Sequence, residues 1–214
     1  GGEMLETKKF SSVDKTFGLA KSLMVFHLVD SHLKHFVFKK PLNVQETANL
    51  HIAMFGMGCF WGVEKMFWGI DGVSMTAVGY SAGLSDFPDY KSVCSRTTGH
   101  SEVVLIHFQP DIISFRELLA IFWESHDPTQ GMRQGNDIGS QYRSGIYTFS
   151  ESDRAVAIET KEKYSKKLEK MGFGLITTEI LPAKKFYYAE EYHQQYLAKN
   201  PRGYCALEGT GLNF

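Results

Sequence analysis

Apolar and polar positions follow a regular pattern from about residue 51 to residue 199 of the chain. Short apolar runs rich in β-branched and aromatic residues predict strands, whereas apolar residues spaced three or four apart predict helices. Strands are expected at 51–57, 73–80, 102–108, 145–149 and 175–181. Helices are expected at 59–68, at 114–127, from 150 to 172 and at 189–199, with a short one after Pro88.

The connections between these elements decide the expected fold class. Strands and helices alternate, but several connections are too irregular for a doubly wound sheet. We therefore expect an α+β fold, a two-layer sandwich in which helices pack on a mixed sheet with a ferredoxin-like core. The first strand–helix–strand unit suits a right-handed crossover.

Three stretches fall outside this pattern. Residues 129–144 form a loop too polar for a simple connector, and the glycine-rich tail after Pro201 is expected to be irregular. Residues 1–50 are expected to be an N-terminal extension, and 51–214 a single domain. Gly1–Glu3 before Met4 resembles a cloning remnant. The rest of the extension has the marks of neither a secretory signal nor an Arg-rich transit peptide, so it is expected to be amphipathic or poorly ordered.

Composition narrows the classes of partner and ligand. A net charge of −1 gives no support for nucleic acid or an anionic membrane as a partner, and no apolar run has the length of a membrane span. The 3 cysteines are an odd number and lie far apart, which argues against a disulfide framework and favours a reducing compartment such as the cytoplasm. No CxxC pair is present to begin a zinc site, so no metal is expected.

Cys59 is the first candidate for chemistry, in a segment where a predicted strand turns into a predicted helix. Free backbone N–H groups and the helix dipole at such a point favour an anion, so the pKa of this thiol is expected to fall below the usual value of about 8.5. The alternative is a small buried apolar side chain without reactivity. The position alone leaves both open.

Residues 58–64, GCFWGVE, resemble the signature of the A-class peptide methionine sulfoxide reductases. Further segments of the chain resemble other parts of the same family in the same order: 98–104 (TGHSEVV), 126–130 (HDPTQ), 135–144 (GNDIGSQYRS), 192–197 (YHQQYL) and 203–205 (GYC). The resemblance covers roughly residues 52–211. Several separated motifs in one order are a specific signal.

This resemblance implies a thiol-dependent reduction of methionine S-sulfoxide, free or in oxidised proteins, and hence protein repair. Cys59 would attack the sulfoxide sulfur, Glu102 would protonate the oxygen, and Cys205 would resolve the resulting sulfenic acid. A Cys59–Cys205 disulfide would then be reopened by a thioredoxin-like reductant. Thiol chemistry and a proton donor suffice, so no cofactor is expected. A monomer is expected.

Glu102 also has support that is independent of the resemblance. It shares one face of a predicted strand with Val104, Ile106 and Phe108, which alternate at period two. A carboxyl group on an apolar face is desolvated, so its pKa should rise toward neutrality and allow it to act as an acid. The alternative is a solvated glutamate at the first residue of a strand.

The remaining site residues follow from the resemblance alone. The hydroxyls of Tyr90 and Tyr142 would hold the sulfoxide oxygen, and Phe60 and Trp61 would form the walls of a methyl pocket. Asp137 would order the nearby loop and its water. These aromatic side chains could equally be ordinary core residues. Cys94 matches no required role, and we expect a packed thiol, with backup resolution as the alternative.

Two other functions and one departure from the family remain open. A thiol peroxidase also passes through a sulfenic acid, but it would have no use for a methyl pocket. A module that only binds oxidised methionine or a partner helix would not need Cys59. Some members of the family carry a further cysteine beyond the resolving one, and residues 206–214 contain none. Direct reopening of a Cys59–Cys205 disulfide is therefore expected, unless the natural chain continues with another cysteine.

Overall fold

The computed structural model describes residues 32–42 and 51–214. Its centre is a mixed six-stranded sheet with the order β7-β6-β1-β3-β2-β8. The strands are β1 (His51–Gly56), β2 (Val73–Ser81), β3 (Ser101–Phe108), β6 (Gly145–Thr148), β7 (Glu179–Pro182) and β8 (Tyr187–Tyr188). Only β6 and β7 pair in parallel, and the other neighbours in this sheet are antiparallel. The predicted α+β class with a mixed sheet is confirmed.

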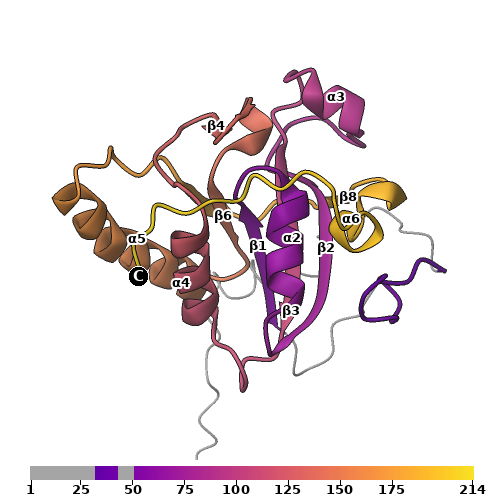
Figure 1. Cartoon of the computed structure of the whole chain (residues 1–214), viewed down its shortest axis with the longest axis horizontal. Coiled ribbons are helices and arrows are strands. Elements are labelled where there is room, and N and C mark those ends of the chain that lie inside the picture. The colour runs from indigo at the N-terminus through magenta and orange to yellow at the C-terminus, as the bar shows by residue number, and fades with distance from the viewer. Residues whose placement is uncertain (1–31, 43–50) are drawn as a thin grey trace, which may run out of the picture.

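The helices lie mainly on one face of this sheet (Figure 1). They are α2 (Phe60–Trp68), α3 (Tyr90–Cys94), α4 (Phe115–Ser125), α5 (Glu151–Lys170) and α6 (Tyr196–Lys199). The chain passes from β1 through α2 to β2 and β3, and then through α4 to β6. With the strand order β6-β1-β3-β2, this is the ferredoxin-like core expected from the sequence.

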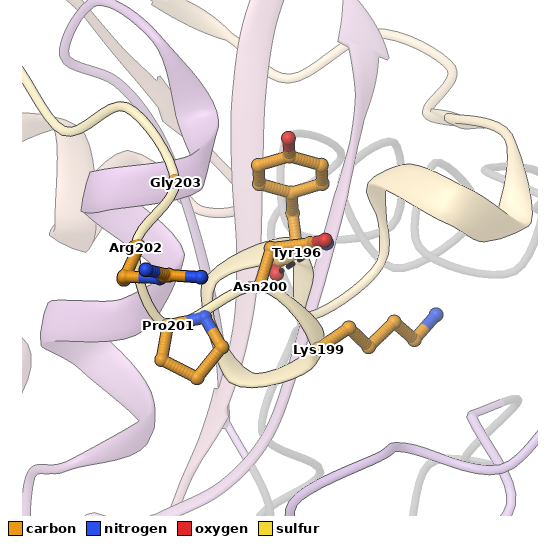
Figure 2. A pocket seen from close by; sticks show the side chains of 6 residues that line it. All are labelled: Tyr196, Lys199, Asn200, Pro201, Arg202 and Gly203. Carbon is orange, nitrogen blue, oxygen red and sulfur yellow. Dashed lines mark hydrogen bonds between the residues drawn. The ribbon is translucent and has the colours of Figure 1, made fainter.

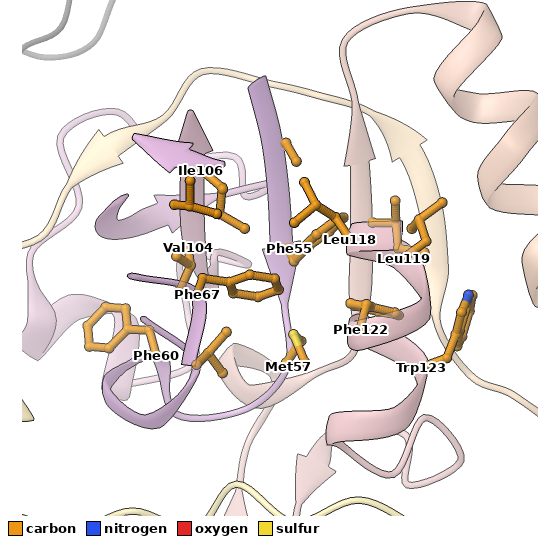
Figure 3. Close-up of a cluster of buried hydrophobic side chains, with 14 of the residues drawn as sticks. Phe55, Met57, Phe60, Phe67, Val104, Ile106, Leu118, Leu119, Phe122 and Trp123 are labelled. Atoms are coloured by element: carbon orange, nitrogen blue, oxygen red, sulfur yellow. The ribbon is translucent and has the colours of Figure 1, made fainter. Parts of the chain in front are cut away.

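The core between the sheet and the helices is built from large apolar side chains (Figure 3). Phe55 near the end of β1 is fully buried and contacts the rings of Phe67 on α2 and Phe122 on α4. Helix α4 begins with a capping box, because the side chains of Ser114 and Glu117 each accept the other residue's backbone N–H. The period-two pattern of β3 is also present, with Val104 and Ile106 facing the helices.

The opposite face of the sheet is covered by chain that the sequence patterns did not assign to it. Leu33, Phe38 and Leu42 pack there with Phe186 against buried residues of the strands. Part of the segment predicted as an extension is therefore packed on the domain. Residues 4–31 and 43–50, for which the sequence predicts an amphipathic or poorly ordered extension, lie outside the described part of the chain.

Three local predictions differ from the structure. The strand predicted at 175–181 begins only at Glu179, and the polar loop holds a small hairpin of β4 (Arg133–Gln134) and β5 (Asp137–Ile138). The helix predicted at 189–199 is replaced by a 3₁₀ turn, η2 (Glu191–His193), and the single turn α6. Gln195 between them has a left-handed backbone with φ of 49°, because its N–H donates to the carboxylate of Glu64 rather than to a helical carbonyl.

Within residues 32–42 and 51–214, no helix combines the length and the apolar character that a bilayer crossing requires. The same described residues contain no group of three His, Cys, Asp or Glu side chains suited to a metal ion.

Candidate active site

Cys59 lies between the end of β1 and the start of α2, as the sequence predicted. Gly58 before it has φ of 91°, and a β-carbon at this position would lie 2.7 Å from Cβ of Gln134. Only glycine fits both the left-handed backbone and this close approach. Cys59 itself is the residue before the first turn of α2, and its side chain does not cap the helix.

The first two free N–H groups of α2 are shared between Glu102 and Cys59. The N–H of Phe60 donates to Oε2 of Glu102 at 3.1 Å. The N–H of Trp61 lies close enough to the thiol of Cys59 to lower its pKa, although it makes no capping hydrogen bond with it. One helix start therefore holds a carboxyl group and a sulfur atom side by side.

The predicted lowering of the Cys59 pKa is wrong in the resting site. Burial raises the pKa of this thiol, and the nearby Glu102 carboxylate raises it further. The N–H of Trp61 lowers the pKa, but by less than burial raises it. A helix start therefore does not keep this thiol ionised before substrate binds.

The predicted behaviour of Glu102 agrees with the structure. Its side chain is 2 % exposed, and burial raises its pKa to about 8 against the lowering effect of the Phe60 N–H. Glu102 is therefore mostly protonated near neutral pH. With Oε2 accepting from Phe60, the other oxygen can carry the proton into the cavity.

A small cavity of about 130 Å³ brings most of the predicted residues together. Its lining consists of Cys59, Phe60, Trp61, Tyr90, Glu102, Asp137, Tyr142 and Tyr204. Burial raises the pKa of both Tyr90 and Tyr142, so both phenols keep their protons. The cavity thus joins one thiol, one protonated carboxyl group and phenol donors beside aromatic rings.

The Trp61 ring is held from two sides. Its indole N–H donates to Nδ1 of His193 at 3.0 Å, and its face stacks on Tyr196 with ring centroids 3.9 Å apart. Burial lowers the pKa of His193 to about 4, so this imidazole is neutral and free to accept at Nδ1. Trp61 therefore has a fixed orientation at the cavity edge.

Cys205 does not line the cavity, but it lies against the same helix. A β-carbon on Gly62 would be 2.8 Å from Sγ of Cys205, so this thiol packs directly on the α2 backbone one turn from Cys59. Cys59, Cys94 and Cys205 are all free thiols, and Cys205 is exposed. Cys59 and Cys205 thus both lie against the first turn of α2, with no disulfide between them.

The tail that carries Cys205 is irregular, as expected, and crosses α2 to end beside α4 and α5 (Figure 1). Its end is fixed by side chains of those helices. The N–H of Phe214 donates to Glu124 at 2.6 Å, and the hydroxyl of Tyr164 bonds to Thr210 and to the carbonyl of Leu212.

Several residues of the site were not found by sequence reasoning. The hydroxyl of Tyr204 donates to both carboxylate oxygens of Asp137 at 3.4 Å. Glu190 accepts the N–H of Tyr90 at 2.7 Å and so fixes the start of α3. His193, Tyr196 and Tyr204 lie within the quoted motifs, and this was the available signal. Cys94 bonds through its thiol to the hydroxyl of Tyr90.

A second hollow of about 410 Å³ lies at α6 and the residues that follow it (Figure 2). It is lined by Tyr196, Lys199, Asn200, Pro201, Arg202 and Gly203. None of the predicted site residues lines it.

Comparisons with known proteins agree with this geometry. The family described as "Peptide methionine sulfoxide reductase" matches residues 51–211. The chain is 58% identical over 179 residues to a peptide methionine sulfoxide reductase MsrA 1 of Synechocystis, covering 84% of this chain and 81% of that protein.

Solved structures give the same picture. Methionine sulfoxide reductase A of Corynebacterium diphtheriae matches with a TM-score of 0.76 and 44% identity, covering 80% of this chain and 83% of that chain. Mxr1 from Saccharomyces cerevisiae, in complex with Trx2, matches with a TM-score of 0.54 and 26% identity, covering 78% and 95%. The chain belongs to the peptide methionine sulfoxide reductases of the A class.

Proposed function

We propose that this chain reduces the S epimer of methionine sulfoxide, free or in oxidised proteins, through Cys59 and Cys205. The observation that carries the proposal is the convergence of Cys59, Glu102 and two phenols on one small cavity with aromatic walls. Phe60 and Trp61 would hold the methyl group of the sulfoxide. Tyr90 and Tyr142 would donate to its oxygen.

In the first step the sulfur of Cys59 attacks the sulfoxide sulfur. Glu102 gives its proton to the sulfoxide oxygen and takes up the proton that leaves the thiol. The oxygen passes to Cys59, so the products are methionine and a sulfenic acid, and Glu102 ends protonated as it began. A raised pKa at Cys59 fits this coupling, because the thiol needs to ionise only while the oxygen is being protonated.

In the second step the thiol of Cys205 attacks the sulfenic sulfur. Water leaves, and a Cys59–Cys205 disulfide forms. Packing of Cys205 on Gly62 supports this pairing, since the tail already lies beside α2. A thioredoxin dithiol then reduces the disulfide and is itself oxidised, in keeping with the yeast relative that was solved with Trx2.

The proposal is tested by turnover of a methionine S-sulfoxide peptide with thioredoxin and its reductase. Wild type should turn over continuously, Cys59→Ser should be inactive, and Cys205→Ser should release about one methionine per enzyme, since its sulfenic acid is not resolved. Cys94→Ser is the matched control and should turn over like wild type, because the serine hydroxyl can keep the hydrogen bond to Tyr90. Methionine release by Cys59→Ser would overturn the assignment of the nucleophile. Faster turnover of hydrogen peroxide than of the sulfoxide would favour a thiol peroxidase instead.

A further inference from the structure

A buried polar network begins at Glu64, one turn along α2 from Phe60 and Trp61. Glu64 is fully buried and has no cationic partner among the described residues. Its carboxylate instead accepts three hydrogen bonds. They come from the hydroxyl of Thr76 at 3.0 Å, the N–H of Gln195 at 2.8 Å and the side-chain amide of Gln195 at 2.7 Å.

Gln195 is the residue through which this network reaches the substrate cavity. Its left-handed backbone is unfavourable for a residue with a side chain, so the two bonds from Glu64 hold the chain in a turn that it would otherwise leave. His193 and Tyr196 lie on either side of this turn. They are the two residues that fix the ring of Trp61, by a hydrogen bond and by stacking.

The segment 32–42, which comes before the predicted domain in the sequence, adds two hydrogen bonds to this network. The N–H of Phe36 donates to the side-chain oxygen of Gln195 at 2.9 Å. His35 is fully buried, and its Nδ1 accepts the N–H groups of Val37 and Phe38. Its Nε2 must therefore carry the hydrogen, which points to Thr76 Oγ1 at 2.9 Å.

The directions of these bonds form one consistent chain. His35 donates to Thr76, and Thr76 donates to Glu64. Glu64 also accepts hydrogen bonds from the backbone N–H and the side-chain amide of Gln195. Every buried polar group in it has a partner, and such a network specifies one arrangement of the elements it joins.

We propose that Glu64 and the segment 32–42 together position the wall formed by Trp61, His193 and Tyr196, and so set how tightly the sulfoxide side chain is bound. His35 and Glu64 are positioning residues, because neither lines the cavity. The proposal rests on the proposed function in taking Trp61 as a wall of the substrate cavity. It gives part of the N-terminal extension a role in the reaction.

Single-turnover reduction, measured against the concentration of a methionine S-sulfoxide peptide, tests this role. His35→Asn keeps an acceptor for the local N–H groups, but its amide is too short to reach Thr76. Thr76→Val has nearly the same shape and removes the link between His35 and Glu64. Both variants should raise the half-saturating concentration about tenfold while the maximal rate stays near that of wild type, since only the binding wall is loosened. His35→Gln, whose longer amide can reach Thr76, should restore part of the loss.

Phe36→Ala is the matched control in the same segment. The Phe36 side chain is exposed, and the network uses only its backbone N–H, which remains. Its half-saturating concentration should match that of wild type.

The indole N–H signals of tryptophan in a ¹⁵N-labelled protein give a readout that does not depend on turnover. His35→Asn and Thr76→Val should shift the Trp61 signal, whereas the Trp123 signal, bonded to Thr160 in the core, should stay and report an intact fold. Because Thr76→Val keeps nearly the same shape, it decides the question even if His35→Asn does not fold. An unchanged half-saturating concentration and an unchanged Trp61 signal in Thr76→Val would overturn the proposal. If wild type reduces no sulfoxide, the proposed function fails, and the Trp61 signal still tests the positioning.

Discussion

The thiol of Cys205 rests directly on the backbone of Gly62, and a β-carbon there would lie only 2.8 Å from Sγ. A β-carbon would also lie 3.2 Å from Cβ of Leu207, so two residues of the tail use the space that glycine leaves. Glycine inside a helix costs about 0.5–1 kcal/mol relative to alanine. Glycine in the first turn of α2 therefore has a reason outside the helix, which is the close packing of Cys205 and Leu207 on its backbone.

Gly62→Ala should slow formation of the Cys59–Cys205 disulfide without slowing the reduction of the first sulfoxide. The methyl group displaces Cys205, so we expect roughly a tenfold slower resolution, with α2 itself more stable by up to about 1 kcal/mol. Rapid quenching followed by mass spectrometry separates sulfenic acid from disulfide.

Gly69→Ala at the end of the same helix is the control for Gly62→Ala. A β-carbon there meets its nearest neighbour at an ordinary 3.5 Å, and resolution should keep its wild-type rate. Equal disulfide formation in Gly62→Ala and wild type would show that the close approach plays no part in resolution.

The rate of sulfoxide reduction should depend on the protonation of Glu102. Because burial raises its pKa to about 8, the carboxyl group is a proton donor below that pH and loses the proton above it. The single-turnover rate of wild type should therefore fall as pH rises through about 8. In Glu102→Gln the rate should be lower by about 10²–10⁴ and this decline should be absent. A decline of the same size in Glu102→Gln would assign it to another group.

The free energy of unfolding should also depend on pH through the ionisation of Glu102. Glu102 has a folded-state pKa near 8 against an ordinary value of 4.5, so the folded state binds more protons than the unfolded state between these pH values. Its contribution to stability is complete below about 4.5 and is lost as pH rises toward 8. Urea unfolding at pH 5 and pH 8.5 should show a smaller loss for Glu102→Gln than for wild type. Glu64 is also buried, and its pKa is raised to about 7, so it too lowers stability as pH rises. This part of the loss remains in Glu102→Gln.

Local patterns in the sequence were enough for much of the fold and for two of the site residues. The period-two alternation of β3 places Glu102 on the helix-facing side, and the apolar spacing of α2 puts Cys59 at a helix start. Both inferences use only neighbours along the chain, where side-chain direction follows from secondary structure.

The errors come from contacts between distant parts of the chain. Residues 189–199 have a helical pattern, but Glu64, 131 residues away from Gln195, takes the backbone N–H that a helix would use. The prediction for the Cys59 pKa is wrong because the thiol is buried, in a cavity that distant parts of the chain, including Tyr142 and Tyr204, help to line. A short stretch of sequence contains neither the Glu64–Gln195 hydrogen bond nor the burial of Cys59, so local patterns cannot predict them.

The fixed end of the tail leads to a last prediction. Tyr164 on α5 holds the tail through its hydroxyl, which bonds to Thr210 at 2.9 Å and to the carbonyl of Leu212 at 3.1 Å. Tyr164→Phe removes both bonds and keeps the ring, so we expect a loss of about 0.5–1.5 kcal/mol per bond and faster hydrogen exchange in residues 206–214. Thr160→Val on the same helix removes the partner of Trp123 instead, and it should lower global stability while the exchange of the tail relative to the core stays the same. Tail exchange as slow in Tyr164→Phe as in wild type would mean that the hydroxyl of Tyr164 does not hold the tail, and that its other contacts with Glu124 and Lys167 are enough.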